Sequence, residues 1–502
     1  MSHDPTPEQG AALDLFRFGD NLAIEAGAGT GKTTTLRMIA SDAAPRTGQY
    51  VAFNRSIVLE AQRTMPDNVA ANTMHSLAMR AIGFRYSGRL RSSTRQRGDQ
   101  VARFLGLDPL VLTFGTQRKV LQPAFLAGLV QRAVTIYCQT ADDEPSRKHV
   151  PYVEGIDLPG VDGRRGWRNN DHVRDHIADA LPKAWADLQK VDDGRLRFRH
   201  EHYLKMWQLS HPTLPVDFLM CDEAQDTSPV MLDVVARQTH AQLVFVGDSQ
   251  QQIYEFTGAV NAMAKVPSSQ RVLLTQSFRF GHEIAARANH VLTEIGADLR
   301  LRGLDSIAST VGPVASPRCV LTRTNATAMN QVLSRQKAGQ HVHLIGGGTE
   351  VLSFAKAAAE LMDGRTTWHP ELACFTTWGE VQAYVESDPQ GSELALLVTL
   401  VDTYGVGTIV AALENQVPEE AADVVVSTAH KSKGREWESV QLADDFPDPR
   451  QSFDALVDPA AALPELRLIY VAATRARERL DVTRVPLFDP LPTPGRPVEV
   501  RP

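Results

Sequence analysis

The sequence predicts an α/β fold built on parallel sheets, with a mostly helical insertion in its first half. Three observations lead to this class. Short apolar runs suited to buried strands alternate with helical patterns along most of the chain. One such run opens into a glycine-rich turn and a helix, and another ends in two acidic residues. From about residue 82 to 212 the periodicity is helical but broken by glycine, proline and charge clusters.

Size and composition indicate a globular protein. The chain has 502 residues, of which 43% are hydrophobic and 22% charged, so it can form roughly three or four structural units. No run approaches 18 uninterrupted apolar residues and no signal-peptide pattern opens the chain, so we expect a cytoplasmic protein without a membrane partner. Four isolated cysteines lack zinc-site spacing and predict neither structural zinc nor disulfides: Cys138, Cys221, Cys319 and Cys374.

The run from Asn21 to Ile39, NLAIEAGAGTGKTTTLRMI, predicts a phosphate-binding loop between a strand and a helix. Glycines let backbone N–H groups face an anion, and the helix N-terminus adds the positive end of its dipole. Lys32 can reach the β- and γ-phosphates, and the Thr33 hydroxyl can bind Mg²⁺. An ordinary glycine-rich turn is the alternative, and kinases, GTPases, transporters and motors all carry such loops. The expected nucleotide contacts are Ala26, Gly27, Ala28, Gly29, Thr30, Gly31, Lys32, Thr33 and Thr34.

The first glycine of the usual pattern is replaced by Ala26, which weakens the match only if that residue needs a positive φ. Upstream, Thr6 and Gln9 fit an N-cap and its capping-box partner. The Gln9 amide could instead read adenine, because it donates and accepts a hydrogen bond at once.

The apolar run from Val216 to Cys221 predicts a strand that ends in DEAQD. Two acids at this point suit hydrolysis beside a phosphate-binding loop: Asp222 would hold Mg²⁺, and Glu223 would orient and activate water. The alternative is an acidic strand end without a role. Further on, Gln251 could sense the γ-phosphate.

Other elements follow the same alternation. We expect strands at 49–53, 69–72, 243–246 and 273–280, and a helix from Asn54 to Arg63. Tyr254 and Phe256 could stack on bases, although aromatics at this spacing are more often core.

The formal net charge of −7 argues mildly against nucleic-acid binding, but basic residues are clustered. Six arginines and no acid lie between Ser76 and Gly98, and two smaller groups follow, so one shared basic surface is plausible. A solvated face is the alternative for each group. The arginines are Arg80, Arg85, Arg89, Arg91, Arg95, Arg97, then Arg164, Arg165, Arg168, then Arg195, Arg197, Arg199.

Six linked segments now show a resemblance. AGAGTGKT, DEAQD, GDSQQQIYEFTGA, QSFRF, VVVSTAHKSKGREW and ELRLIYVAATRARERL occur in the order typical of superfamily 1 DNA helicases of the UvrD, Rep and PcrA group. The chain is most similar to the helicase part of F-box DNA helicases, and we expect no F-box segment before it. The resemblance covers nearly the whole chain outside residues 82–212 and 350–420.

The resemblance implies two RecA-like P-loop domains with ATP and Mg²⁺ in the cleft between them. Gln9 would read adenine, Phe278 would stack on it, and Glu436 would contact the ribose. Arg279 and Arg475 would reach the γ-phosphate from the second domain, where a planar fork of donors stabilises developing charge. Residues expected to line a single-strand groove are Phe53, Asn54, Thr73, His75, Tyr254, Phe256 and His430.

Three positions depart from the family pattern: Thr34 and Thr257 replace arginines, and Met74 replaces an aromatic residue. They put some coupling and nucleotide contacts in doubt but leave every expected hydrolytic residue in place. The expected units are residues 1–81 with 213–278, the helical DNA-binding insertion 82–212, residues 279–349 with 421–485, a vestigial insertion 350–420, and an extended tail 486–502.

The resemblance implies an ATP-dependent DNA helicase or translocase that moves 3′ to 5′ on single-stranded or partly duplex DNA, associated with the nucleoid. DNA repair, recombination and antiviral defence are the candidate pathways. The rival is an ATP-gated DNA-binding subunit whose motor activity depends on a partner such as a nuclease. A non-helicase P-loop enzyme is a distant third.

Overall fold

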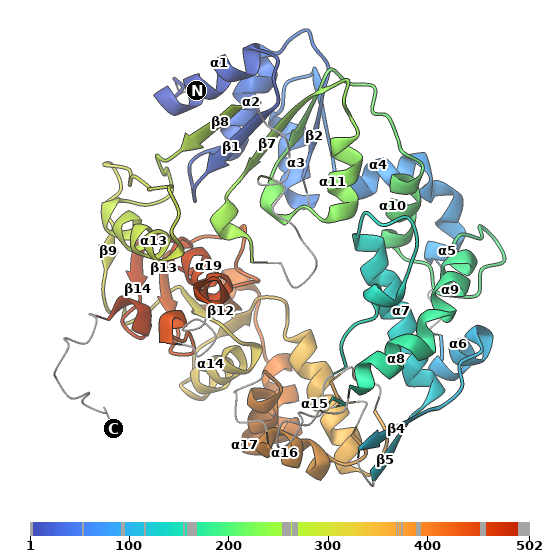
Figure 1. Ribbon diagram of the computed structural model, residues 1–502. Coiled ribbons are helices and arrows are strands. Elements are labelled where there is room, and N and C mark those ends of the chain that lie inside the picture. The colour runs from blue at the N-terminus through green and yellow to red at the C-terminus, as the bar shows by residue number, and fades with distance from the viewer. Residues whose placement is uncertain are drawn as a thin grey trace.

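The computed structural model describes residues 4–489 apart from 53–54, 92–95, 115–116, 154–155, 158–167, 254–262, 264–269, 368, 370, 373–374, 388–392 and 452–457. Two parallel sheets form its centre, and each carries an insertion (Figure 1). The first sheet lies in the blue and green part of the chain, and the second lies in the yellow and red part. The predicted α/β class with parallel sheets is confirmed.

The first sheet has six strands in the order β3-β2-β6-β7-β1-β8, all parallel. Its central strands are buried on both faces, which explains why they read as continuous apolar runs. Its elements are α1 (Pro7–Arg17), β1 (Leu22–Ala26), α2 (Lys32–Asp42), β2 (Gly48–Val51), α3 (Arg55–Thr64), β3 (Val69–Asn72), α4 (Met74–Ala81), β6 (Phe218–Cys221), α11 (Pro229–Ala236), β7 (Gln242–Gly247) and β8 (Gln270–Leu274).

One strand prediction is wrong in its extent. A strand was expected at 273–280, but β8 ends at Leu274. The next residues leave the sheet because other groups take their hydrogen bonds: Thr275 N–H donates to the Glu8 carboxylate at 2.7 Å, and Phe278 N–H donates to the Gly29 carbonyl at 2.8 Å. The chain therefore crosses over the glycine-rich loop after β1.

The second sheet also has six parallel strands, in the order β11-β12-β10-β13-β14-β9. Helices α13 and α19 pack against each other beside it, and their apolar side chains share one core with the strands. The elements are α13 (His282–Ile295), β9 (Thr310–Val311), β10 (Cys319–Thr322), α14 (Asn325–Lys337), β11 (Val342–Leu344), β12 (Val424–Thr428), β13 (Trp437–Leu442), α19 (Leu463–Ala473) and β14 (Ala476–Asp481).

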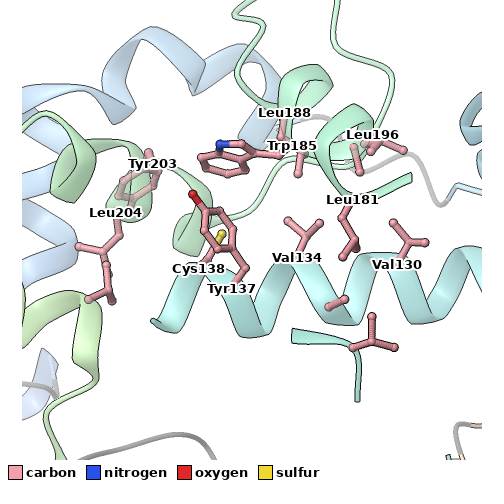
Figure 2. Close-up of a cluster of buried hydrophobic side chains, with 14 of the residues drawn as sticks. Val130, Val134, Tyr137, Cys138, Leu181, Trp185, Leu188, Leu196, Tyr203 and Leu204 are labelled. Carbon is pink, nitrogen blue, oxygen red and sulfur yellow. The ribbon is translucent and has the colours of Figure 1, made fainter. Parts of the chain in front are cut away.

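The first insertion is mostly helical, as expected, with one antiparallel hairpin, β4-β5, that the sequence pattern did not suggest. Figure 2 shows its core, where side chains of α7 such as Val134 and Tyr137 meet Leu181 and Trp185 of α9. The elements are α5 (Ser87–Arg91), α6 (Gly98–Leu105), β4 (Leu110–Phe114), β5 (Gln117–Leu121), α7 (Pro123–Gln139), α8 (Asn169–Ala178), α9 (Ala180–Leu188) and α10 (His200–Leu209).

The second insertion, expected to be reduced, is helical. It contains α15 (Thr349–Met362), α16 (Trp378–Ser387) and α17 (Glu393–Glu414), whose apolar residues form a core together with α14 and strands of the second sheet. The hairpin of the first insertion contacts it, since Lys119 Nζ lies 5.3 Å from the centre of the Phe375 ring. The expected domain boundaries stay a prediction.

Helix α17 corrects the expectation that no segment is apolar enough to cross a membrane. By length and composition its window Leu394–Glu414 passes that test, with a mean hydropathy of 1.8. Gly405 breaks the helical backbone at φ 75°, and the Asp402 carboxylate accepts hydrogen bonds from Trp378 and Gln382. Because α17 packs on α14 and α15 while only 28% of its apolar window is buried, we interpret it as a helix that packs on the insertion through one face.

The described cysteines lie in the apolar core. Cys138, Cys221 and Cys319 are buried and free, and Cys374 lies outside the described residues. Most of the expected tail also lies outside the described residues, since the structure describes only 486–489 of it.

Candidate nucleotide site and nucleic-acid surface

The predicted phosphate-binding loop joins β1 to α2. Gly29 and Gly31 have φ values of 74° and 79°, which favour glycine, and Gly31 is the N-cap of α2. Ala26 ends the strand itself and has no positive φ, so alanine fits there without strain. A methyl group at Gly29 would come within 2.6 Å of Arg279 Cβ. Glycine is therefore required for the close approach of the segment that follows β8.

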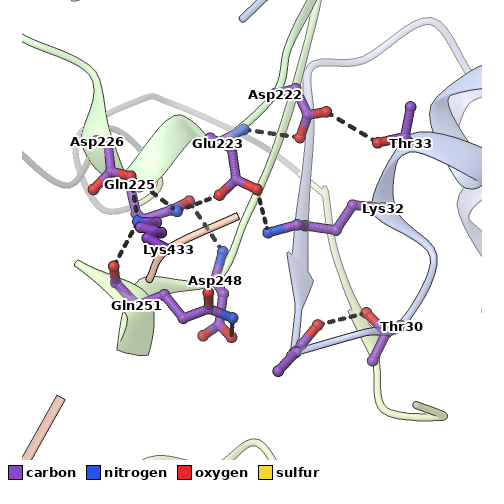
Figure 3. Close-up of polar contacts among 12 residues, drawn as sticks. Thr30, Lys32, Thr33, Asp222, Glu223, Gln225, Asp226, Asp248, Gln251 and Lys433 are labelled. Carbon is purple, nitrogen blue, oxygen red and sulfur yellow. Dashed lines mark hydrogen bonds and ion pairs between the residues drawn. The ribbon is translucent and has the colours of Figure 1, made fainter. Parts of the chain in front are cut away.

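The two predicted acids lie at the end of β6, opposite the start of α2 (Figure 3). Thr33 Oγ1 donates a hydrogen bond of 3.3 Å to Asp222 Oδ2, and the Tyr50 hydroxyl donates one of 2.6 Å to the same oxygen. A hydroxyl and a carboxylate this close offer the oxygen ligands that Mg²⁺ prefers, so the donor set fits the ion. Burial and then the charge of Glu223 raise the pKa of Asp222.

Glu223 is held in an unusual conformation. Its φ of 52° and ψ of 43° lie in the left-handed region, which non-glycine residues seldom adopt and which is enriched at functional sites. Lys32 Nζ lies 2.8 Å from Glu223 Oε1, and Gln225 Nε2 donates to Oε2 at 2.6 Å. Burial alone would raise the pKa of Glu223, but the charges of Lys32 and Lys433 lower it to about 2. The carboxylate is thus ionised and aimed into the cleft.

Gln9 and Phe278 both lie beside Gly31 of the loop, where the resemblance places the adenine. A methyl group at Gly31 would lie 3.4 Å from Gln9 Nε2 and 3.6 Å from Phe278 Cε2. The Phe278 ring is 46% exposed and so has a free surface for stacking. The capping box is also confirmed, because Thr6 and Gln9 exchange side-chain to backbone hydrogen bonds of 3.0 and 3.2 Å. Gln9 Nε2 also donates to Thr35 Oγ1, and the role of Gln9 toward adenine stays a prediction.

Arg475 and Gln251 come from different sheets and meet in the cleft. Arg475 Nη2 donates to Gln251 Oε1 at 3.2 Å, and Gln251 Nε2 donates to Asp248 Oδ2 at 2.7 Å. Arg475 is only 2% exposed, and burial, followed by the charge of Arg279, lowers its pKa to about 9. It is therefore still a cation at neutral pH. Arg279 lies nearby and lines the same cavity.

Glu436, the expected ribose contact, forms an ion pair with Arg279, whose Nε lies 2.6 Å from Glu436 Oε2. Its carboxylate is partly exposed, and its role toward ribose stays a prediction. Thr34 lies on the first turn of α2 and is half-buried.

Tyr470 is a residue of this site that sequence reasoning missed. It belongs to α19 of the second sheet region and is fully buried, yet its hydroxyl reaches the phosphate-binding loop. Ala28 N–H donates to the Tyr470 hydroxyl at 3.3 Å, and that hydroxyl donates to Asp248 Oδ2 at 3.0 Å. Because Asp248 also binds Gln251, one chain of hydrogen bonds joins the loop to Arg475 across both sheets.

Lys433 makes a second connection between the sheets (Figure 3). Its Nζ forms an ion pair with Asp226 Oδ2 and donates to the Gln251 carbonyl at 2.7 Å. Asp226, Asp248, Lys433 and Tyr470 all lie inside the motifs that the sequence revealed, so motif membership was the available signal. What was missing was the contact between segments up to 442 residues apart.

These groups surround a cavity of about 650 Å³ between the two sheets and the first insertion. Gly29, Lys32, Glu223, Arg279 and Arg475 line one end, so the cavity includes the phosphate side of the nucleotide site. His75 of α4 and Leu204 of α10 line it as well.

The expected single-strand contacts are only partly described. Thr73 caps α4 through a 3.1 Å hydrogen bond from Ser76 N–H, and His75 follows it in the cavity wall. Burial and the neighbouring charge of His200 lower the pKa of His75 to about 4, so it is neutral near pH 7. His430 is half-buried in the turn after β12. Phe53, Asn54, Tyr254, Phe256 and Thr257 lie outside the described residues.

The predicted basic run between Ser76 and Gly98 needs one correction. Arg89 is not a solvated or phosphate-facing residue: its side chain is 9% exposed and donates to the carbonyls of Leu188 and Leu196 at 3.0 and 2.7 Å. Its guanidinium also stacks on the Phe198 ring at 5.1 Å. Arg89 therefore holds the insertion together. Arg95, Arg164 and Arg165 lie outside the described residues.

Fold and site together define a P-loop nucleotide-binding protein with its site between two parallel sheets. Two family models match the chain: the AAA domain at residues 9–257 and the UvrD-like helicase C-terminal domain at residues 381–485. The chain is 28% identical to F-box DNA helicase protein 1 of Schizosaccharomyces pombe, with 92% of this chain and 55% of the relative aligned. It is also 28% identical to F-box DNA helicase 1 of Gallus gallus, over 92% of this chain and 47% of the relative.

A shorter match, 32% identical, aligns 16% of the chain with 12% of a probable DNA helicase II homolog of Mycoplasma genitalium. The chain spans about half the length of the two F-box helicases. It belongs to the UvrD-like superfamily 1 helicases, as its motifs indicated.

Proposed function

We propose that this protein is an ATP-dependent DNA helicase or translocase. The observation that carries the proposal is the cleft in which a phosphate-binding loop, a Glu223 carboxylate and the buried Arg475 guanidinium converge from two sheets. This arrangement suits phosphoryl transfer to water, because catalysis there consists of positioning and of stabilising negative charge.

Each residue has a role that follows from its position. The loop amides and Lys32 bind the phosphates, and Gln9 and Phe278 hold the adenine between them. Thr33 and Asp222 would hold Mg²⁺, which supplies positive charge to the phosphate oxygens. Glu223 orients the attacking water and accepts its proton, while Arg475 and Arg279 stabilise the charge that develops on the transferred oxygens.

Glu223 and the γ-phosphate compete for the Lys32 ammonium in this scheme. A γ-phosphate would draw the Lys32 ammonium away from Glu223, since a phosphate carries more negative charge than a carboxylate. Loss of that ion pair would raise the pKa of Glu223 from about 2 toward its ordinary value. Phosphate binding therefore makes Glu223 a better proton acceptor.

DNA is the proposed substrate because the relatives are named DNA helicases and because His75 lines the same cavity as the nucleotide site. A strand at His75 would lie against a neutral imidazole, which suits a base or sugar better than a phosphate. Movement from 3′ to 5′, work in repair, recombination or antiviral defence, and a cytoplasmic, nucleoid-associated location belong to the same proposal.

The decisive experiment measures ATP hydrolysis with and without single-stranded DNA, followed by displacement of a strand from duplexes with a 3′ or a 5′ single-stranded tail. We expect strong stimulation by single-stranded DNA and unwinding of the 3′-tailed duplex alone. Slow, unstimulated hydrolysis with ATP-dependent DNA binding would instead support an ATP-gated subunit that needs a partner such as a nuclease.

A further inference from the structure

Glu25 is an acidic residue inside the strand that leads into the phosphate-binding loop. It lies one residue before the end of β1, paired with Gly247 of β7 on one side and Leu273 of β8 on the other. Its neighbours along the strand, Ile24 and Ala26, are fully buried. A carboxylate in such a strand loses hydration on folding and needs partners in return. The catalytic roles proposed above leave this carboxylate without a function.

The Glu25 carboxylate holds the start of the turn that carries Gln251. Its Oε1 accepts a hydrogen bond from Ser249 N–H, and its Oε2 accepts one from Ser249 Oγ, both at 2.7 Å. Ser249 opens the short 3₁₀ turn Ser249–Gln251, which follows directly on Asp248 after β7. One carboxylate therefore fixes both the backbone and the side chain at the first residue of this turn.

The other end of the turn contacts the second sheet region. Gln251 Oε1 accepts a hydrogen bond from Arg475 Nη2, and the Gln251 carbonyl accepts one from Lys433 Nζ. Helix α19, which precedes Arg475, also packs against the turn. Because the turn is only three residues long, a shift of Ser249 would move Gln251 and its hydrogen bond to Arg475.

We propose that Glu25 is a positioning residue for ATP hydrolysis, which sets the place of Gln251 and Arg475 relative to the phosphate-binding loop by holding Ser249. This role rests on the proposed function. The loop begins directly after β1, so Glu25 ties the turn to the same strand that carries the loop. A carboxylate suits the task because it accepts both hydrogen bonds, whereas an apolar side chain would leave Ser249 N–H without this partner.

The test compares two substitutions of the same residue. Glu25→Leu removes both hydrogen bonds, whereas Glu25→Gln keeps an acceptor for Ser249 N–H and can donate to Ser249 Oγ. Burial, followed by the charge of Asp248, raises the pKa of Glu25, so loss of the charge should matter less than loss of the hydrogen bonds. We expect Glu25→Leu to lower kcat about tenfold with KM for ATP little changed, and Glu25→Gln to keep most of the wild-type rate.

A second background separates positioning from folding. In a protein that already carries Gln251→Ala, Glu25→Leu should lower kcat no further, because its effect passes through Gln251. The exposed Glu283→Leu on α13 is the matched control and should change neither kcat nor the melting temperature. A further tenfold loss in the Gln251→Ala background, or a lower melting temperature of Glu25→Leu with wild-type kcat, would overturn the proposal.

Binding of ADP with aluminium fluoride, which imitates the transferred phosphate, distinguishes this role from the motor itself. Glu25→Leu should weaken binding of the analogue about tenfold while leaving the affinity for ADP alone unchanged. A wild-type protein that neither hydrolyses ATP nor binds the analogue more tightly than ADP would refute the motor and this role together. A wild-type protein that does both, with unchanged kcat and analogue binding in Glu25→Leu, would refute only the role of Glu25.

Discussion

The two sheets contain the same kind of strand-to-helix junction but use it differently. In the first, β1 opens through glycines into α2, and the loop amides and Lys32 are positioned for an anion. In the second, β10 turns into α14 at Arg323 and Thr324, whose N–H groups both donate to the Asp445 carboxylate at 3.0 Å. The second junction is therefore already occupied by an anion from the chain itself.

This difference explains the division of labour in the cleft. A bound Asp445 carboxylate fills the place where a phosphate would need free amides, so only the first sheet is suited to a nucleotide. The second sheet region supplies cations and a hydroxyl through Arg475, Lys433 and Tyr470. We propose that the first sheet region binds and hydrolyses the nucleotide, and that the second stabilises the charge that develops on its phosphates. The following predictions test that division, from the largest expected effect to the smallest.

Lys32→Ala and Glu223→Gln should both abolish turnover, for different reasons. The first removes a phosphate contact and should weaken ATP binding. The second keeps the contact but removes the proton acceptor, so ATP should still bind. Nucleotide binding and hydrolysis measured separately distinguish them, and Thr64→Ala on the exposed end of α3 is a neutral control. A Glu223→Gln protein that hydrolyses ATP at the wild-type rate would contradict the assignment of the base.

Arg475→Ala should lower kcat by roughly 10³-fold or more, with nucleotide affinity nearly unchanged. The reason is that a guanidinium in the cleft helps most when charge develops on the transferred phosphate. Single-turnover kinetics measure the rate of the hydrolysis step separately from product release. Arg479→Ala, four residues on and half exposed, is the matched control, because its partner Glu438 is not one of the expected site residues. Normal kcat in Arg475→Ala would show that the second sheet does not reach the reaction.

Asp445→Ala should leave the N–H groups of Arg323 and Thr324 without their carboxylate, at a cost of about 2 kcal/mol in the free energy of unfolding. No nucleotide site should appear, since this junction has neither the glycines nor the lysine of the first. Denaturant unfolding and nucleotide binding test both points, with the exposed Asp444→Ala as control. Unchanged stability would refute the idea that Asp445 fills the second junction.

Tyr470→Phe removes one hydroxyl from the chain of hydrogen bonds between the loop and Gln251. The free energy of unfolding should fall by about 1 kcal/mol, the usual net contribution of a buried hydrogen bond. If Tyr470 positions Asp248 and Gln251, the loss should appear in kcat and in the degree of stimulation by DNA, with KM for ATP little changed. A lower melting temperature with wild-type kinetics would mean that the hydroxyl only stabilises the fold.

Sequence and structure agree where chemistry is local. The loop AGAGTGKT, the acids after β6 and the capping box of α1 are each set by a few consecutive residues, and each has the predicted geometry. Prediction failed where distant groups compete for the backbone. The Glu8 carboxylate and the Gly29 carbonyl end β8 earlier than its apolar pattern suggests. The sequence predicts Arg89 as an exposed charge, but in the structure its guanidinium donates to the carbonyls of Leu188 and Leu196.

By itself the sequence determined the α/β class, the order of the motifs and a set of candidate hydrolytic residues, because residue spacing alone places a lysine, a hydroxyl and two carboxylates at strand ends. The tertiary structure decided which groups meet across the cleft. Tyr470 on Asp248, Lys433 on Asp226 and Arg89 on the Leu196 carbonyl join segments far apart in the chain. Such contacts arise from packing of whole elements, and no local pattern of residues encodes them.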